Sequence, residues 1–264
     1  MMAATDRNKP LNAEATPHLS YSRLQKYLTC PEQYRLYYIE KLRAMVENAS
    51  LVFGSVMHLA LAEYFRRQID PARTFLQDWD VLNDVQLRFS QKESWQKLRD
   101  IGQGLLEKFL RDEAPKIGQV FSVERIFELG VSNLNLPFVS VIDLVAEMDG
   151  KRTLIEFKTA ASDFEDYEVD LLDQVTAYKL AEPDVQQIAV CVLVKTKAPK
   201  IRWHRTDRTP DDVVEYLEKA ETVAHQIEQS VFYKRIGKWC RQCEFLPVCL
   251  GDKGKARDTL VRIA

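Results

Sequence analysis

Residues 154–158, Leu154-Ile155-Glu156-Phe157-Lys158, form a short apolar stretch that carries charge at every second position. Successive residues of a strand point to opposite faces, so Glu156 and Lys158 would share one face. Ile155 and Phe157 would then point the other way, into a core. Burying a carboxylate and an ammonium on an apolar strand carries a desolvation cost, which favours a functional role for the pair.

A second apolar run precedes this strand at residues 138–145, and it contains Asp143. An Asp-Gly pair at residues 149–150 separates the two runs, and Asp-Gly between alternating apolar residues is a strong hairpin signal. A hairpin would place Asp143 beside Glu156. Two carboxylates can hold a hard divalent cation, and Lys158 can position or activate a water next to it. The three side chains therefore predict equipment for hydrolysing a phosphodiester bond.

Length and composition set the broad class of the protein. The 264 residues suit one domain, or one domain with an insertion, and the apolar fraction of 46% is typical of a full core. The net charge of −2 gives no indication of nucleic acid, so any basic surface must be local. No apolar run reaches the roughly 18–20 residues of a membrane span, and residues 1–10 lack the apolar centre of a signal peptide. We expect a cytoplasmic protein without a membrane partner, and a flexible N-terminal arm over residues 1–18.

The hydrophobic pattern predicts a mixture of helices and strands. Ser20 or Ser22 can cap the first helix. Residues 70–115 read as a helical insertion that forms either a lid over the site or only packing, and Gly102 and Gly104 favour a bend within it. The other predicted helices and strands lie over residues 20–28, 32–39, 54–65, 167–180 and 210–229, and over residues 120–129, 187–194 and 201–205, respectively.

Three groups of residues have both a structural and a functional interpretation. His58 lies on a predicted apolar helix, where a single histidine is usually a hydrogen-bonded core residue. Gln174 and Tyr178 are four residues apart and share one helix face. The tyrosines within residues 34–38 could stack on bases, although core packing is the commoner role of such residues.

Four of the five cysteines are candidates for metal binding. Cys240, Cys243 and Cys249 are spaced C-x2-C-x5-C, and Cys30 adds a fourth thiol. We assign Cys191 to the core because it lies in an apolar run. One close pair with two single cysteines fits a [4Fe-4S] cluster at least as well as a structural Zn²⁺. Either metal group would link the two ends of the domain and would act first as a structural clamp.

Together these motifs resemble the PD-(D/E)XK nuclease superfamily, in particular RecB-like exonucleases with an iron–sulfur cluster. Relatives of that kind include the AddB C-terminal nuclease and the CRISPR-associated adaptation exonuclease. The resemblance extends over residues 20–249, and its strength lies in the order of motifs that are weak alone. The matching segments are Ser20-Tyr21-Ser22-Arg23-Leu24 with Cys30-Pro31, Gly54 with His58, Asp143 with Glu156-Phe157-Lys158, Gln174 with Tyr178, and the three C-terminal cysteines.

The resemblance implies an α/β fold with a restriction-endonuclease-like mixed β-sheet flanked by helices. It implies one nuclease domain over residues 19–249, with the helical insertion at about 70–115, and a C-terminal tail over residues 250–264. A Mg²⁺ or Mn²⁺ site would be formed by His58, Asp143, Glu156 and the backbone carbonyl of Phe157. The implied catalytic residues are Asp143, Glu156, Lys158, Gln174 and Tyr178, and the implied cluster ligands are Cys30, Cys240, Cys243 and Cys249.

The implied function is a metal-dependent DNA exonuclease that acts on single-stranded DNA ends in DNA repair or recombination, phage DNA processing or CRISPR adaptation. Basic residues such as Arg23, Lys26 and Arg35 would follow the phosphates. The alternative is a DNA-end-binding module that cuts little and serves a helicase or integrase partner, and a third possibility is a zinc-stapled structural protein. One departure from the family is that Ser140 or Val141 stands where relatives often have glycine.

Overall fold

We analysed the protein in a computed structural model, which describes residues 18–130 and 136–263. The predicted arm over residues 1–18 lies outside the described residues except for His18, which is buried. No described helix is both long enough and apolar enough to cross a membrane.

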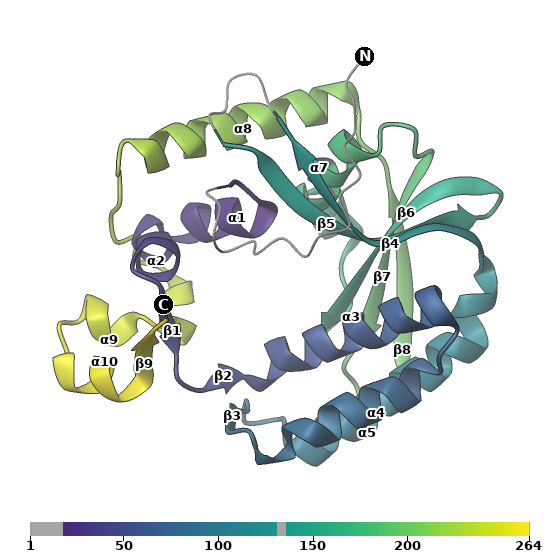
Figure 1. Cartoon of the computed structure of the whole chain (residues 1–264), viewed down its shortest axis with the longest axis horizontal. Helices are drawn as coiled ribbons and strands as arrows, with labels where there is room; N and C mark the ends of the chain where they lie inside the picture. The colour runs from purple at the N-terminus through teal and green to yellow at the C-terminus, as the bar shows by residue number, and fades with distance from the viewer. Residues whose placement is uncertain (1–17, 131–135, 264) are drawn as a thin grey trace.

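A five-stranded mixed sheet in the order β4-β5-β6-β7-β8 forms the centre of the molecule (Figure 1). β4 (Ile117–Leu129), β5 (Phe138–Met148) and β6 (Lys151–Ala160) are antiparallel neighbours. β7 (Gln187–Val194) runs parallel to β6, and β8 (Lys200–Thr206) is an antiparallel edge strand. The predicted α/β class with a mixed sheet flanked by helices is confirmed.

The predicted hairpin joins β5 to β6. Asp149 and Gly150 have φ angles of 53° and 72°, and two adjacent positive φ angles are what a type I′ hairpin turn requires. Strand pairing runs from Met148 opposite Lys151 to Leu144 opposite Ile155. This register places Asp143 and Glu156 at the next positions of the two strands, which is where the sequence predicts that the acids meet.

Helices on one face of the sheet form a core with α3 (Ala49–Arg67), α4 (Pro71–Val81) and α5 (Trp95–Lys108). In Figure 1 these three helices lie below the sheet, with α3 nearest to it. The bend predicted at Gly102 is wrong, because α5 continues through this residue. A Cβ atom at position 102 would lie 2.2 Å from the ring of Phe75, so glycine here permits close packing of α4 on α5.

The connections around these helices are short. The chain from α4 to β4 passes through η2 (Leu82–Asp84), β3 (Leu87–Arg88), α5, the π-helical η3 (Phe109–Glu113) and η4 (Ala114–Lys116). β3 pairs in parallel with β2 (Glu47–Asn48). The insertion therefore contributes to the core on this face of the sheet, as the packing alternative predicted.

The other face of the sheet packs against α1 (Tyr21–Thr29), α2 (Pro31–Tyr34), α6 (Asp166–Asp170), α7 (Asp173–Ala181) and α8 (Pro210–Glu228). Two of the predicted helices differ in detail. The second helix continues as a π-helical segment, η1 (Arg35–Ile39). The single helix predicted over residues 167–180 is wrong, because the chain breaks between α6 and α7 and a buried arginine binds the carbonyl groups at the break.

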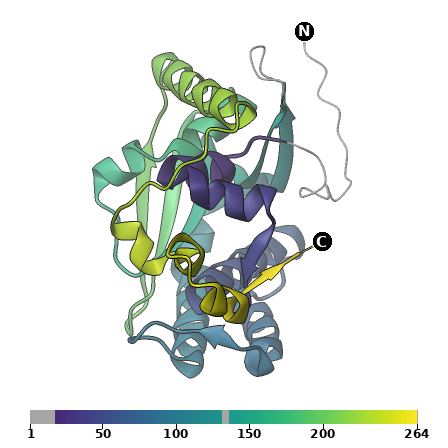
Figure 2. The same ribbon diagram turned by 90° about the vertical axis from the view of Figure 1, so that its left-hand side faces the viewer.

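The C-terminal segment returns to the beginning of the domain. It consists of η5 (Lys238–Gln242), α9 (Leu246–Cys249), α10 (Lys253–Thr259) and β9 (Leu260–Arg262). β9 pairs antiparallel with β1 (Leu42–Ala44), and Figures 1 and 2 show the yellow C-terminal segment beside α2 and β1. The residues predicted as a tail after position 249 thus include a helix and a paired strand.

Candidate active site

The two acids meet where β5 and β6 separate. The strand pairing ends at Leu144 and Ile155, so the backbone N–H of Phe157 is free to donate to Asp143 Oδ2, at 2.9 Å. This opening brings together side chains from both faces of the sheet. His58 reaches it from one face, and Lys158 and Gln174 reach it from the other.

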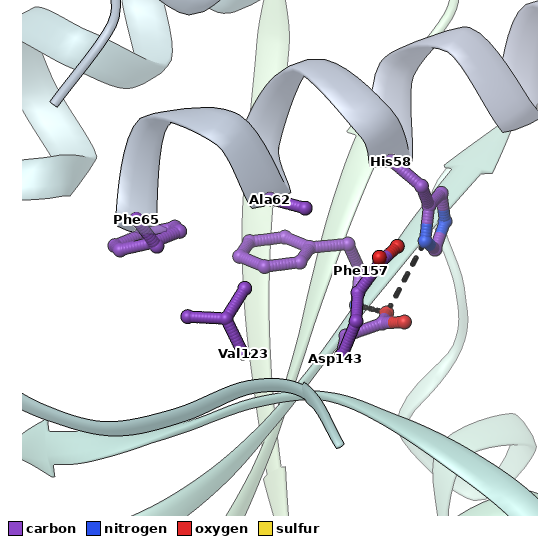
Figure 3. A pocket seen from close by; sticks show the side chains of 7 residues that line it. His58, Ala62, Phe65, Val123, Asp143 and Phe157 are labelled. Atoms are coloured by element: carbon purple, nitrogen blue, oxygen red, sulfur yellow. Dashed lines mark hydrogen bonds and ion pairs between the residues drawn. The ribbon is translucent and has the colours of Figure 1, made fainter. Parts of the chain in front are cut away.

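His58 is positioned by the close approach of α3 to β6. Gly54 lies one turn before His58, and a Cβ atom at Gly54 would lie 3.2 Å from Thr159 Oγ1 on β6. His58 Nδ1 lies 3.3 Å from Asp143 Oδ2. Figure 3 shows the histidine pointing from α3 toward the aspartate. The glycine and the histidine of the predicted motif therefore work together, because the first allows the helix close enough for the second to reach Asp143.

A chain of hydrogen bonds continues on the other face of the sheet. Lys158 Nζ lies 2.7 Å from Glu156 Oε1 and donates to Gln174 Oε1 at 2.5 Å. Gln174 Nε2 in turn donates to Tyr178 Oη at 2.5 Å. Gln174 and Tyr178 are neighbours on α7, so the tyrosine fixes the orientation of the amide that contacts the lysine.

Burial and charge set opposite protonation tendencies for the two acids. Burial, followed by the charge of Asp143, raises the pKa of Glu156 to about 7. Burial also acts to raise the pKa of Asp143, but the hydrogen bond and charge of His58 outweigh burial and the pKa is lowered. The pKa of Lys158 is raised because the charge of Glu156 outweighs burial. Asp143 and Lys158 are therefore charged at neutral pH, and Glu156 is poised between its two states.

One oxygen of Glu156 is left without a partner. Glu156 is 1% exposed, and its Oε2 atom has no hydrogen bond within the described structure. Leaving a buried polar atom unsatisfied costs about 1–3 kcal/mol, and far fewer such atoms are found in native proteins than satisfied ones. A cation bound beside this oxygen would remove that cost. The chemistry of the donors thus fits a hard divalent cation, which prefers carboxylate and carbonyl oxygen.

A small cavity of about 10 Å³ adjoins the acids and is lined by His58, Asp143 and Phe157 (Figure 3). This is the space needed by a single water-sized particle. In the described part of the chain, no three histidine, cysteine, aspartate or glutamate side chains are gathered closely enough to form a complete metal site. The ligand set of His58, Asp143, Glu156 and the Phe157 carbonyl therefore stays a prediction, supported by the unpaired oxygen of Glu156.

Two residues near the site escaped the sequence analysis. Glu124 lines the same cavity, and its φ of 43° is unusual for a residue other than glycine. Glu124 Oε2 accepts a hydrogen bond from Arg66 at 3.0 Å. Tyr21 is close enough to Lys158 and Glu156 for their charges to act on its pKa, which burial raises. No pattern in the sequence marks Glu124, whereas Tyr21 lies inside the first matching motif.

The cysteine predictions concern a second region of the molecule. The charges of Cys30 and Cys249 both act on Cys243, and those of Cys30 and Cys240 act on Cys249, so the four thiols lie in one neighbourhood. Burial raises the pKa of the Cys243 and Cys249 thiols. Cys30 Sγ accepts a hydrogen bond from the backbone N–H of Arg235 at 3.4 Å. Cys191 is completely buried in β7, which confirms its assignment to the core.

Comparisons with known proteins agree with this architecture. No curated protein matches the chain. The crystal structure of a "Putative exonuclease" from Eubacterium rectale is similar, with a TM-score of 0.53, 15% sequence identity, and coverage of 88% of this chain and 86% of that one. A second structure, SSO0001, has a TM-score of 0.36 and 14% identity, and the match covers 87% of this chain and 93% of that one. The family model of the PD-(D/E)XK nuclease superfamily matches residues 18–250. Since that match spans nearly the whole described chain, the protein belongs to the PD-(D/E)XK nuclease superfamily.

Proposed function

We propose that the protein is a metal-dependent deoxyribonuclease that removes nucleotides from single-stranded DNA ends. Members of the superfamily are hydrolytic nucleases and generally use divalent metals such as Mg²⁺ or Mn²⁺. The observation that carries the proposal for this chain is the buried Glu156 carboxylate. One of its oxygens pairs with Lys158 and the other, unpaired, lies in the same cluster of charges as Asp143.

Each side chain of the site has a definite part in this proposal. Asp143, Glu156, His58 and the Phe157 carbonyl would hold the cation, which supplies Lewis acidity and lowers the pKa of a bound water. Lys158 remains charged and is held between Glu156 and Gln174, so that it can orient the attacking water and stabilise negative charge on the phosphate. Gln174 and Tyr178 position the lysine.

Cleavage assays with purified protein test this proposal. End-labelled single-stranded and double-stranded DNA would be incubated with Mn²⁺ or Mg²⁺, and we expect shortening of the single strand from its end. Lys158→Ala should lower kcat by at least about 100-fold, since it removes a charge that acts in the transition state. Lys151→Ala, in the exposed β5–β6 turn, is the matched control. Absence of cleavage by the wild type, or full cleavage by Lys158→Ala, would contradict the proposal.

The same assay separates the enzyme from a DNA-end-binding module. A module that serves a helicase or integrase would bind end-labelled DNA with wild-type affinity in a mobility-shift experiment and would leave it intact in Mn²⁺. The paired acids and the charged lysine favour the enzyme, because a module needs no buried carboxylate with an unpaired oxygen.

We further propose that Cys30, Cys240, Cys243 and Cys249 ligate a [4Fe-4S] cluster, with Zn²⁺ as the alternative. Support comes from four thiols brought into one neighbourhood from opposite ends of the chain. Iron, sulfide and zinc analysis of protein purified without oxygen distinguishes the two. Four iron atoms per chain with a broad absorbance near 400 nm are expected, and one zinc atom per chain with no visible absorbance would replace the cluster by a zinc site.

A further inference from the structure

A second and larger pocket, of about 240 Å³, lies between α1, η1 and β1, beside the end of the chain at Ile263. Its lining includes the cationic residues Arg23, Lys41 and Arg43. None of the described residues that line it is acidic. A protein whose net charge is close to zero has therefore collected positive charge in one hollow, as a local site for an anion requires.

The cations of this pocket are held by aromatic rings. The guanidinium of Arg23 lies 4.4 Å from the ring centre of Tyr38. Lys26 and Arg43 lie 4.0 Å and 3.5 Å from the ring centre of Tyr37. Cation–π contact orders a charged side chain without neutralising its charge, which an ion pair with a carboxylate would do. Ordered, uncompensated cations bind an anion with less loss of entropy than freely moving ones.

Ion pairing separates these residues from the third cation that the sequence analysis grouped with them. Arg35 pairs with Glu32 at 2.7 Å and with Glu40, so its charge is compensated, and the prediction that it follows phosphates loses its support. Within the described residues, Arg23, Lys26 and Lys41 have no ion pair with a carboxylate. Their charge is therefore available to a ligand.

The first turn of α1 connects the pocket to the candidate active site. Ser20, Ser22 and Arg23 line the pocket, while Tyr21, between them in sequence, is close enough to Lys158 for its charge to act on the tyrosine. Adjacent Cα atoms are 3.8 Å apart, so the two sites share one turn of one helix. Free N–H groups of a first helical turn add to the attraction for an anion.

We propose that this pocket binds a phosphate of the DNA strand next to the phosphodiester that is cleaved. The inference rests on the proposed nuclease function and adds a binding subsite to it. Arg23 and Lys41 would provide the charge, and the serine hydroxyls would donate hydrogen bonds to the phosphate oxygens. A terminal phosphate and an internal phosphodiester offer the same chemistry, and the experiment below distinguishes them.

Metal-free DNA binding tests the pocket independently of cleavage. The affinity of a fluorescent oligothymidylate of about ten nucleotides would be measured by anisotropy in EDTA over a range of salt concentrations. The test variant is Arg23→Gln/Lys41→Asn; Lys41 has a φ of 54°, which asparagine tolerates. Lys151→Gln, an exposed turn lysine, is the charge-matched control for one lost cation, and Arg23→Lys tests whether charge alone is enough.

We expect the double variant to bind about tenfold more weakly, while Arg23→Lys and Lys151→Gln bind nearly as well as the wild type. The slope of log affinity against log salt should become shallower by about 1.4, because each lost phosphate contact on a single strand contributes about 0.7. In cleavage assays the change should lie in KM. Wild-type affinity and slope in the double variant, an equal loss in Lys151→Gln, or no binding by the wild type would overturn the proposal.

Oligonucleotides with 5′-phosphate, 5′-hydroxyl, 3′-phosphate or 3′-hydroxyl ends identify the source of the phosphate. A terminal phosphate that strengthens binding in the wild type, but not in the double variant, assigns the pocket to a strand end. Equal binding of all four, still weakened in the double variant, assigns it to an internal phosphodiester. A wild type that binds DNA through the pocket and never cleaves it would contradict the nuclease proposal and leave the pocket supported.

Discussion

A buried glutamate governs the site at the scale of single residues. Glu156 is 1% exposed, its pKa is raised to about 7, and its Oε2 atom has no hydrogen-bond partner in the described structure. Asp143, in contrast, has a lowered pKa because His58 outweighs burial. Two neighbouring acids with pKa values shifted in opposite directions are typical of catalytic and metal-binding sites.

The raised pKa of Glu156 predicts a pH dependence of metal binding. A cation binds the deprotonated carboxylate, and below pH 7 Glu156 is increasingly protonated in the free protein. Affinity for Mn²⁺ should therefore fall about tenfold per pH unit as the pH is lowered below about 7, and should level off above it. Calorimetric titrations between pH 5.5 and 8.5 measure this. An affinity that does not change over this range would show that Glu156 gives up no proton when the metal binds.

Arg66 and Glu124 show what single-residue reasoning missed. Glu124 lines the cavity beside His58 and Asp143, yet it lies in an ordinary run of mixed residues on β4. Its position depends on an irregular φ angle and on a partner 58 residues away in sequence. Neither is visible in the spacing of residues, because both arise only once α3 packs against the sheet.

At the scale of elements, the approach of α3 to β6 controls the position of His58. Gly54→Ala would place a methyl group 3.2 Å from Thr159 Oγ1, so that the helix or the threonine must move by a few tenths of an ångström. Alanine is the better helix former by about 1 kcal/mol, so the free energy of unfolding should not fall. We expect kcat/KM to fall about tenfold, because small displacements of catalytic groups are costly.

Removal of the threonine hydroxyl is the control for this effect. Gly54→Ala/Thr159→Ala lacks the atom that the new methyl group would meet, and should recover much of the lost activity. Cleavage rates and urea unfolding of the three variants measure both quantities. Wild-type activity in Gly54→Ala, or a large loss of stability, would show that the close approach does not position His58.

Arg208 holds the break between α6 and α7, the element that carries Gln174 and Tyr178. It is 7% exposed, donates to Thr176 Oγ1 at 2.7 Å, and donates to the carbonyl groups of Val169 and Leu172. Arg208→Ala would leave these carbonyl groups unsatisfied and should lower the free energy of unfolding by about 2–4 kcal/mol. Urea unfolding measures the loss. A change below about 0.5 kcal/mol would contradict the role of this arginine.

The elements that the sequence predicts well are those set by local chemistry. The hairpin follows from Asp149-Gly150, whose two positive φ angles only a few residue types adopt readily. β7 follows from its continuous apolar run, which two covered faces require. The predicted bend at Gly102 and the unbroken helix over residues 167–180 are wrong for one reason. Both depend on distant partners, Phe75 and Arg208, that no local pattern contains.

At the scale of the whole molecule, the C-terminal segment closes the domain onto its beginning. β9 pairs with β1, and Leu36, Phe245 and Leu260 form a small core between the two ends of the chain. The four thiols of the proposed cluster lie in the same region. A metal group bound there would add a covalent link between segments that already pack together.

Replacing one proposed cluster ligand should therefore cost global stability. Cys240→Ser would remove the link between residues that are far apart in sequence, and such links contribute about 2–4 kcal/mol. Thermal unfolding followed by circular dichroism should show a lower Tm in Cys240→Ser and in wild-type protein stripped of metal. Ser230→Ala, outside the cysteine segment, serves as the control. Equal Tm values in all four samples would show that these cysteines hold no structural metal.

Binding of Mn²⁺ tests the central claim most directly, because the whole account requires the carboxylates of Asp143 and Glu156 to share an ion. Electron paramagnetic resonance titrations would compare the wild type with Asp143→Asn/Glu156→Gln, and with Glu147→Gln, an exposed position on β5. We predict at least one tightly bound Mn²⁺ in the wild type and in Glu147→Gln, and none in the double variant. Equal Mn²⁺ binding by the double variant would contradict the account.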